Sequence, residues 1–159
     1  MKANTLKHLK IRSARAQDKT ALAQIAEDTE LFPGTMLDGM ITSYLSGASQ
    51  DIWLVGELNA DPICFGYCAP EQMTDSTWNL LAIGVLTPFQ GQGLGTQLIR
   101  AVEAHLRAQG ERLLLVETMG TPDFAQTRQF YRQNGYTEEA RIRDFYEAGG
   151  DKIVFWKRL

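Results

Sequence analysis

The chain has 159 residues, 44% of them hydrophobic and 22% charged, which is typical of a soluble globular protein and suits a single domain over residues 1–159. Its 16 lysines and arginines against 19 acidic residues give a net charge of −3, which argues against a general nucleic-acid binder. No apolar stretch is long enough to span a membrane, and none follows residues 1–5. We therefore expect a cytoplasmic protein with no export signal, no membrane span and no nucleic-acid partner.

The first half of the chain predicts a helix over residues 17–31. Its apolar residues Leu22, Ile25 and Ala26 share one helical stripe, and Pro33 and Gly34 follow the end of the pattern. The other elements expected here are strands over residues 9–14, 52–57 and 62–69, the last two forming a hairpin, and a short helix over residues 35–45.

Both cysteines lie in the strand predicted over residues 62–69. Cys64 and Cys68 have equal parity, so their side chains point to one face of the strand. Along an extended strand they are too far apart for a relaxed disulfide, and no histidine is near them to complete a metal site. We expect two buried or half-buried free thiols and no metal.

The middle of the chain predicts a strand–helix–strand unit. Residues 80–86 and 113–116 are apolar runs typical of strands buried on both faces. Between them we expect a helix that Gly110 ends, and its apolar residues recur every four positions at Leu94, Leu98, Val102 and Leu106. Such a connection makes the two strands parallel, with a right-handed crossover.

The end of the chain predicts one more helix and two strands. Residues 122–134 form the helix, with Thr121 as its N-cap and Pro122 at its first position. Residues 136–145 and 152–157 form the strands. The complete order predicts an α+β fold in three layers, with a mostly antiparallel sheet and one parallel crossover.

Residues 90–96, Gln-Gly-Gln-Gly-Leu-Gly-Thr, lie directly between a buried strand and a helix. The first turn of a helix has unpaired backbone N–H groups and the positive end of the helix dipole, and glycines allow a bulky anion to approach closely. The N–H groups expected to converge on one pyrophosphate belong to Gln92, Gly93, Leu94, Gly95 and Thr96. A tight glycine turn without a ligand is the alternative, and we favour the ligand.

Two common phosphate-binding patterns do not fit this turn. The dinucleotide fingerprint G-x-G-x-x-G, started at Gly91, meets Thr96 where its third glycine belongs. A P-loop needs a lysine after its last glycine, and none is present. A nucleotide-binding protein therefore stays only as a weaker alternative.

The pattern that fits is Q-x-x-G-x-G, with Gln90, Gly93 and Gly95 at its fixed positions. Here the sequence resembles the GNAT family, the GCN5-related N-acetyltransferases. Residues 127–136, which contain Phe130-Tyr131 and end in Gly135-Tyr136, resemble another signature of that family, and residues 143–152 resemble a bacterial subgroup whose members mostly have unassigned substrates. The resemblance implies a mixed seven-stranded sheet with helices on both faces.

The resemblance also implies acetyl-CoA as the acetyl donor. Its pantetheine arm would pair with the strand backbone around Ile83, Gly84 and Val85, where an amide polarises the thioester carbonyl. Its pyrophosphate would lie on residues 90–96, which include Gln90 and Gly91. Arg128 is a candidate for the CoA 3′-phosphate, although a helix arginine is more often simply solvated.

Tyr131 matches the family tyrosine that protonates the departing thiolate as a general acid. Many relatives carry a glutamate base on the fourth strand, and the matching residue here is Asn79, which cannot act as a base. Glu117, at the end of the next strand, is the preferred substitute. An exposed strand-end carboxylate is an equal alternative for Glu117, and Asp144 or a water relay are further candidates for the base.

The expected acceptor is a primary amine, and we favour a small molecule over a protein. Family analogy makes residues 27–40, with Phe32 and several acids, a wall of its pocket. Trp78, Asn79 and Tyr146 could line the same pocket or pack on the sheet. The resemblance is also compatible with a homodimer.

The sequence thus predicts an acyltransferase that moves the acetyl group of acetyl-CoA to an amine. A non-catalytic acyl-CoA-binding sensor or regulatory module is the alternative. Asn79, in place of an acid, favours the sensor, and Tyr131 favours the enzyme.

Overall fold

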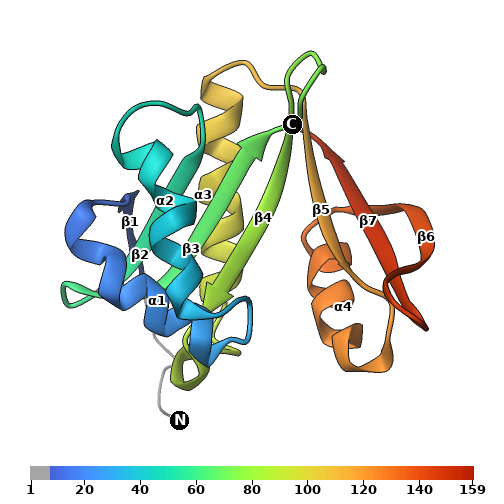
Figure 1. Ribbon diagram of the computed structural model, residues 1–159, viewed down its shortest axis with the longest axis horizontal. Coiled ribbons are helices and arrows are strands. Elements are labelled where there is room, and N and C mark those ends of the chain that lie inside the picture. Colours follow the sequence, from blue (N-terminus) through green and yellow to red (C-terminus); the bar gives the residue numbers. More distant parts are fainter. Residues whose placement is uncertain (1–7) are drawn as a thin grey trace, which may run out of the picture. The chain divides into compact units, whose positions relative to one another are not determined.

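The computed structural model describes residues 8–159, which form a seven-stranded sheet and four α-helices (Figure 1). The strand order is β1-β2-β3-β4-β5-β7-β6. The expectation about an export signal rests on residues outside this range. In chain order the elements are β1 (Lys10–Ser13), α1 (Lys19–Asp28), α2 (Leu37–Leu45), β2 (Ile52–Leu58), β3 (Asp61–Pro70), β4 (Thr77–Val85), α3 (Leu94–Ala108), β5 (Leu113–Met119), α4 (Ala125–Gln133), β6 (Thr137–Glu147) and β7 (Gly150–Arg158).

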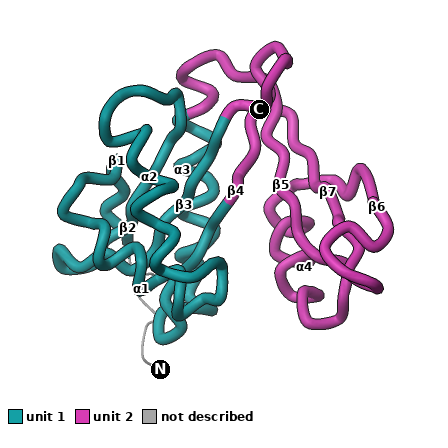
Figure 2. The backbone as a smooth tube through the Cα atoms, viewed as in Figure 1, with its two compact units in different colours: residues 1–69, 82–105 teal, residues 70–81, 106–159 magenta. Residues whose placement is uncertain are grey.

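The chain divides into two compact units (Figure 2). The first unit contains the described part of Met1–Ala69 together with Ala82–His105, and the second contains Pro70–Leu81 and Leu106–Leu159. Strand β4 and helix α3 each pass from one unit to the other. Each unit is described by itself below.

In the first unit, helices α1 and α2 cover one face of the β1-β2-β3 sheet and α3 covers the other (Figure 1). The predicted stripe of α1 is confirmed, because Leu22 and Ile25 are buried together with Trp53 and Phe65. The rings of Trp53 and Phe65 are stacked with centroids 5.8 Å apart. Burial of such aromatic side chains supplies much of the stability of a domain.

In the second unit, the first half of β4 pairs in parallel with β5, from Thr77 beside Leu113 to Leu80 beside Val116. The parallel strand–helix–strand connection is therefore confirmed. Strands β7 and β6 continue the sheet in antiparallel pairs. Helix α4 packs on this sheet through Tyr131, whose ring centroid is 5.4 Å from that of Phe155.

Two predicted helix boundaries are wrong by three residues. The helix expected to reach residue 31 ends at Asp28, because the Thr29 hydroxyl donates a hydrogen bond to the Ile25 carbonyl and Glu30 takes a left-handed φ of 55°. The last helix begins at Ala125 rather than at Pro122, which starts a separate 3-10 turn. Thr121 precedes that turn without a side-chain cap.

The two cysteines are free and buried, as predicted. Among residues 8–159, no helix combines the length and the apolar character required to cross a lipid bilayer.

Candidate active site

The glycine turn has the backbone that its sequence predicts. Gly91 and Gly93 have φ values of 73° and 78°, in the left-handed region that favours glycine, and α3 begins directly afterwards at Leu94. Within the described chain, the backbone N–H groups of residues 91–96 donate to no acceptor. A row of unpaired amides therefore precedes the first turn of α3, where the helix dipole favours an anion.

Hydrogen bonds at the start of this turn and just before it hold it in place. Gln90 donates from Nε2 to the carbonyl of Val85, the last residue of β4, at 2.8 Å. Thr87 donates from its backbone N–H and its hydroxyl to Asp28 Oδ2, both at 2.8 Å. These two hydrogen bonds hold the pKa of Asp28 below its usual value. The turn is thus tied to the ends of both β4 and α1.

The last residues of β4, which the resemblance assigns to pantetheine, alternate in burial. Gly84 is buried, whereas Ile83 and Val85 are partly exposed. A Cβ atom at Gly84 would lie 2.9 Å from Leu31 Cδ1 and 3.1 Å from Thr29 Oγ1. A larger residue at Gly84 would therefore push away the segment that follows α1.

Tyr131 is enclosed by aromatic rings and is only 4% exposed. Its ring contacts Phe155 and lies 6.0 Å from the ring of Tyr136. The hydroxyl has no hydrogen-bond partner in residues 8–159. It is not fully enclosed, so it keeps some contact with solvent. Burial raises the pKa of Tyr131, so the hydroxyl remains protonated at neutral pH.

Glu117 belongs to a connected polar cluster in the second unit. Its Oε1 atom is 2.9 Å from Lys152 Nζ and 3.3 Å from Asn79 Nδ2. Asn79 Nδ2 also donates to Glu71 Oε1 at 2.8 Å, and Lys152 Nζ lies 4.2 Å from the ring centroid of Phe145. Sequence reasoning missed Glu71 and Lys152, because only the folded chain brings Glu71 to Asn79 and Lys152 to Glu117.

Arg128, predicted for the CoA 3′-phosphate, joins β5 to α4. Its Nη1 atom donates to the carbonyls of Met119 and Thr121, both at 2.8 Å. Its phosphate role remains a prediction, but one of its nitrogens already satisfies two backbone carbonyls.

The other candidates for the base and the acceptor pocket have distinct environments. Asp144 accepts a hydrogen bond from the Gly149 N–H at 2.8 Å and shapes the β6–β7 turn. Trp78 and Asn79 are each 4% exposed, so they offer little surface to a substrate. Tyr146 is 44% exposed, and burial together with the Glu117 charge raises its pKa.

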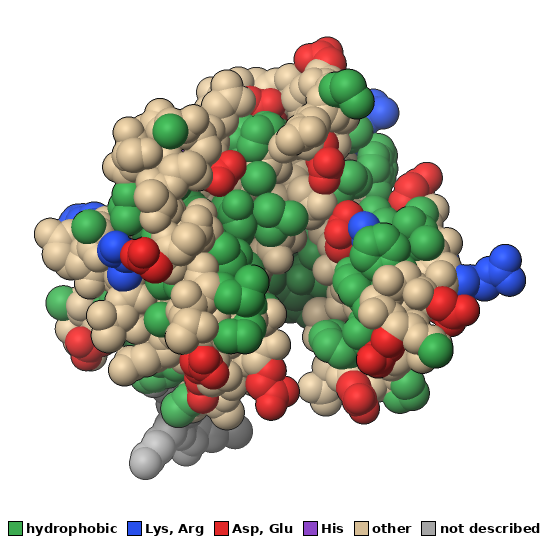
Figure 3. Space-filling model, in the orientation of Figure 1, with side chains coloured by type: hydrophobic (Ala, Val, Ile, Leu, Met, Phe, Trp, Pro, Cys, Tyr) green, Lys and Arg blue, Asp and Glu red, His purple; other side chains and the backbone are tan. Residues whose placement is uncertain are grey.

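Several side chains of residues 27–40, the expected wall of the acceptor pocket, make contacts within the protein. Phe32 is half-buried, with its ring centroid 6.4 Å from that of Phe65. Glu27 accepts a hydrogen bond from the Gly34 N–H at 2.6 Å, and Asp38 is paired with Lys19 at 2.6 Å. Figure 3 shows apolar side chains at the surface of both units, and acidic groups that are dispersed over them.

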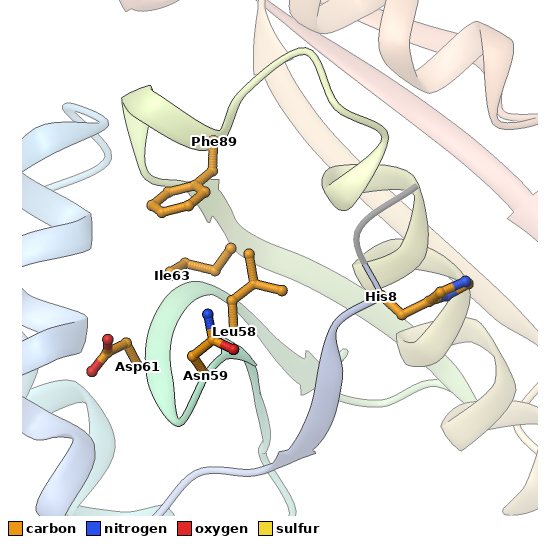
Figure 4. A pocket seen from close by; sticks show the side chains of 6 residues that line it. All are labelled: His8, Leu58, Asn59, Asp61, Ile63 and Phe89. Atoms are coloured by element: carbon orange, nitrogen blue, oxygen red, sulfur yellow. The ribbon is translucent and has the colours of Figure 1, made fainter. Parts of the chain in front are cut away.

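A pocket of about 320 Å³ in the first unit lies at the β2–β3 hairpin (Figure 4). Its lining residues are His8, Leu58, Asn59, Asp61, Ile63 and Phe89. None of the predicted site residues lines this pocket, so it contributes nothing to the candidate active site.

Comparisons with known proteins agree with this fold. The chain is similar in structure to a Desulfovibrio desulfuricans protein of the GNAT family, with 27% identity, a TM-score of 0.86, and coverage of 95% of this chain and 99% of that one. It is also similar to the Escherichia coli ribosomal-protein-S18-alanine N-acetyltransferase, with 20% identity, a TM-score of 0.75, and coverage of 95% and 94%. A third similar structure is yncA of Salmonella typhimurium, solved with its cofactor acetyl-CoA, with 18% identity, a TM-score of 0.77, and coverage of 96% and 95%.

A search of curated protein sequences found no match. The sequence model of the Acetyltransferase (GNAT) domain matches residues 49–138, which is more than half of the chain. The match includes the glycine turn, Glu117 and Tyr131. The chain therefore belongs to the GNAT family of acetyltransferases.

Proposed function

We propose that this protein is an N-acetyltransferase that moves the acetyl group of acetyl-CoA to a primary amine by direct attack. The amine nitrogen forms a bond to the thioester carbonyl carbon, the carbon–sulfur bond breaks, the nitrogen loses a proton and the CoA sulfur gains one. The observation that carries the proposal is the row of unpaired amides at residues 91–96. The bound acetyl-CoA of the Salmonella relative supports the choice of donor.

The first unit supplies the binding of the donor. Amides at the start of α3 hold the pyrophosphate, which the helix dipole stabilises. The backbone around Gly84 pairs with the pantetheine arm, and an amide there donates to the thioester oxygen as negative charge develops. One such donor is typically worth about 3 kcal/mol of barrier lowering.

Tyr131 acts on the departing sulfur. Its buried hydroxyl stays protonated and has no partner in the described protein, so it is available to the thiolate. An ordinary thiol has a pKa of about 8.5, so a tyrosine whose pKa is raised is the weaker acid of the two. The hydroxyl therefore contributes most by hydrogen bonding to the sulfur as the carbon–sulfur bond stretches, and the proton follows.

Glu117 acts on the amine. An alkylamine with a pKa of about 10 is mostly protonated at neutral pH, so it must lose a proton before it attacks. Glu117 Oε2 has no partner in residues 8–159, and the side chain is 29% exposed. Glu117→Gln should remove the acid limb of the pH–rate profile, and a variant that keeps this limb would exclude Glu117 as the base.

The decisive experiment measures release of the CoA thiol from acetyl-CoA with a panel of amines, with mass spectrometry of the product. The panel contains small alkylamines, amino acids, aminoglycosides, and peptides with free N-termini or lysines. We expect acceptor-dependent thiol release and a product heavier by one acetyl group, with the best rates among the small molecules. Release that no acceptor increases would contradict the proposal.

The alternative is a non-catalytic acyl-CoA sensor, which Asn79 favours because an amide cannot accept the amine proton. Tight acetyl-CoA binding without acceptor-dependent thiol release would support the sensor. Thermal stabilisation by NAD or ATP, in place of CoA, would instead support a nucleotide-binding protein.

A further inference from the structure

Asn79 lies in the part of β4 that pairs with β5, and its amide bridges two carboxylates of the second unit. Nδ2 donates one hydrogen to Glu71 Oε1 at 2.8 Å and the other to Glu117 Oε1 at 3.3 Å. Ionised carboxylates only accept hydrogen bonds, so the reversed amide would place an oxygen against two acceptors. The hydrogen-bond partners therefore determine the orientation of this amide.

Satisfying both carboxylates leaves the amide oxygen without a partner. Asn79 is 4% exposed, and its Oδ1 atom is enclosed without a hydrogen bond. A buried acceptor that makes no hydrogen bond destabilises the fold, and most proteins avoid one. The residue is therefore poorly explained as a stabilising element of the strand, and better explained by what its Nδ2 atom holds.

The backbone fixes both ends of this bridge. Glu71 directly follows β3, and its N–H donates to the Thr77 carbonyl at 2.8 Å, which closes the connection to β4. On the other side, the parallel pairing of β4 and β5 ends at Leu80 beside Val116, and Glu117 is the next residue of β5. Asn79 thus joins two carboxylates whose backbones are already placed by hydrogen bonds.

Lys152 contacts the same oxygen of Glu117 from another strand. Its ammonium is 2.9 Å from Glu117 Oε1 and lies over the ring of Phe145. The side chain is only 13% exposed, and the β5–β7 register places Lys152 beside Met119. Both partners of Glu117 therefore bind Oε1, and Oε2 remains available.

We propose that Asn79 is a positioning residue for Glu117, and that Glu71 in turn orients Asn79. The Glu71–Asn79–Glu117 chain and Lys152 hold Oε1, so that Oε2 points its lone pairs at the incoming amine. This inference rests on the proposed function. It assigns a role to the residue that stands where many relatives carry a glutamate: Asn79 does not replace that base but places another.

The test is a double-mutant cycle on turnover at saturating acetyl-CoA and amine, with Asn79→Ala, Glu117→Gln and the double variant. A misplaced base lowers turnover on the order of 10- to 100-fold, so we expect a loss of this size in Asn79→Ala with an unchanged KM for acetyl-CoA. If Asn79 acts only through Glu117, the double variant is no slower than Glu117→Gln. Losses that multiply in the double variant would show a merely structural role and overturn the inference.

A second pair of variants keeps the test valid if Asn79→Ala folds poorly. Glu71→Gln retains an oxygen acceptor for Asn79 and should keep most of the turnover, whereas Glu71→Ala should lose turnover in the same non-additive way. Lys152→Met removes the ammonium that holds Oε1, so it should lower turnover in the wild type but not in Glu117→Gln. Glu139→Gln, at an exposed carboxylate of β6, is the matched control and should change none of these quantities.

The outcomes separate this inference from the proposed function. A wild-type protein that transfers acetyl to no amine refutes the proposed function. An active wild type in which Glu117→Gln is slow but Asn79→Ala and Glu71→Ala are both normal refutes the positioning role alone. Circular dichroism melting curves and acetyl-CoA affinity, measured on every variant, identify any loss of fold.

Discussion

Replacement of Tyr131 by phenylalanine removes one hydroxyl and leaves the aromatic packing in place. The ring would keep its neighbours Tyr136 and Phe155, whose centroids lie 6.0 Å and 5.4 Å away. The hydroxyl donates to no group in the described protein, so no intramolecular hydrogen bond is lost. The proposed general acid, however, is abolished. Stability and turnover should therefore respond in different ways.

The expected magnitudes follow from these contacts. A hydroxyl with little solvent contact and no hydrogen-bond partner carries a desolvation cost, so Tyr131→Phe should be as stable as the wild type or more stable by up to about 1 kcal/mol. In a chain of this size that free energy raises the melting temperature by about 2–4 °C. Loss of a general acid lowers turnover by about 10²- to 10⁴-fold, which equals roughly 3–5 kcal/mol of barrier.

Tyr44→Phe is the matched control, because its hydroxyl has the opposite situation. Tyr44 donates to the Ala14 carbonyl at 3.0 Å, so its loss should cost about 0.5–1.5 kcal/mol of stability and leave turnover unchanged. Tyr131→Phe should therefore lower turnover without lowering stability, and Tyr44→Phe should lower stability without lowering turnover.

The assay is acceptor-dependent thiol release at saturating substrates from about pH 6 to about pH 10. Acetyl-CoA affinity is measured by calorimetry and stability by thermal melting. Burial raises the pKa of Tyr131, so its ionisation should produce no basic limb below about pH 10 in the wild type. Turnover of Tyr131→Phe that stays near the wild-type value over this pH range would refute the assigned role, as would a loss that merely follows a fall in melting temperature.

Three further predictions concern backbone strain, thiol reactivity and a buried ion pair. Gly91→Ala meets no neighbouring atom but keeps a φ of 73°, so it should lose about 1–2 kcal/mol in thermal melting and bind acetyl-CoA more weakly in calorimetry. Burial raises the pKa of Cys64 to about 12 and also that of Cys68, so both thiols should react with a thiol reagent at about pH 8 only after denaturation. Arg12→Ala removes the cation that is paired with the buried Asp18 carboxylate and should cost about 3–5 kcal/mol in denaturant titration. Arg12 lowers the pKa of Asp18, so the stability from this pair is present above the ordinary Asp pKa and is lost as the pH falls through the lowered value; wild type and variant should therefore converge in acid.

The parts of the fold that the sequence predicts correctly are those encoded by neighbouring residues. The helical spacing of Leu94, Leu98 and Val102 is local, and all three side chains are buried. The glycine turn is local as well, because Gly91 and Gly93 are needed where the backbone takes a positive φ. The parallel crossover follows from the order of these elements.

The parts that the sequence does not predict depend on contacts between distant residues or on competing local hydrogen bonds. Asn79 and Glu117 are 38 positions apart, and only the β4–β5 pairing brings them together. Lys152 reaches Glu117 through the separate β5–β7 register. Helix α1 is shorter than its apolar pattern predicts, because the Thr29 hydroxyl and the left-handed Glu30 end it earlier.

Asn79 and Glu117 have to be interpreted together. The sequence alone shows an amide at a position where a base is expected, which suggests lost catalysis. The structure places that amide 2.8 Å and 3.3 Å from two carboxylate oxygens. A third carboxylate there would meet two like charges, and a pair of unit charges at about 4 Å repels by about 4 kcal/mol near a protein surface. With Glu71 and Glu117 present, an uncharged donor is therefore the stable choice at position 79, and an acid at 117 accounts for the absence of one at 79.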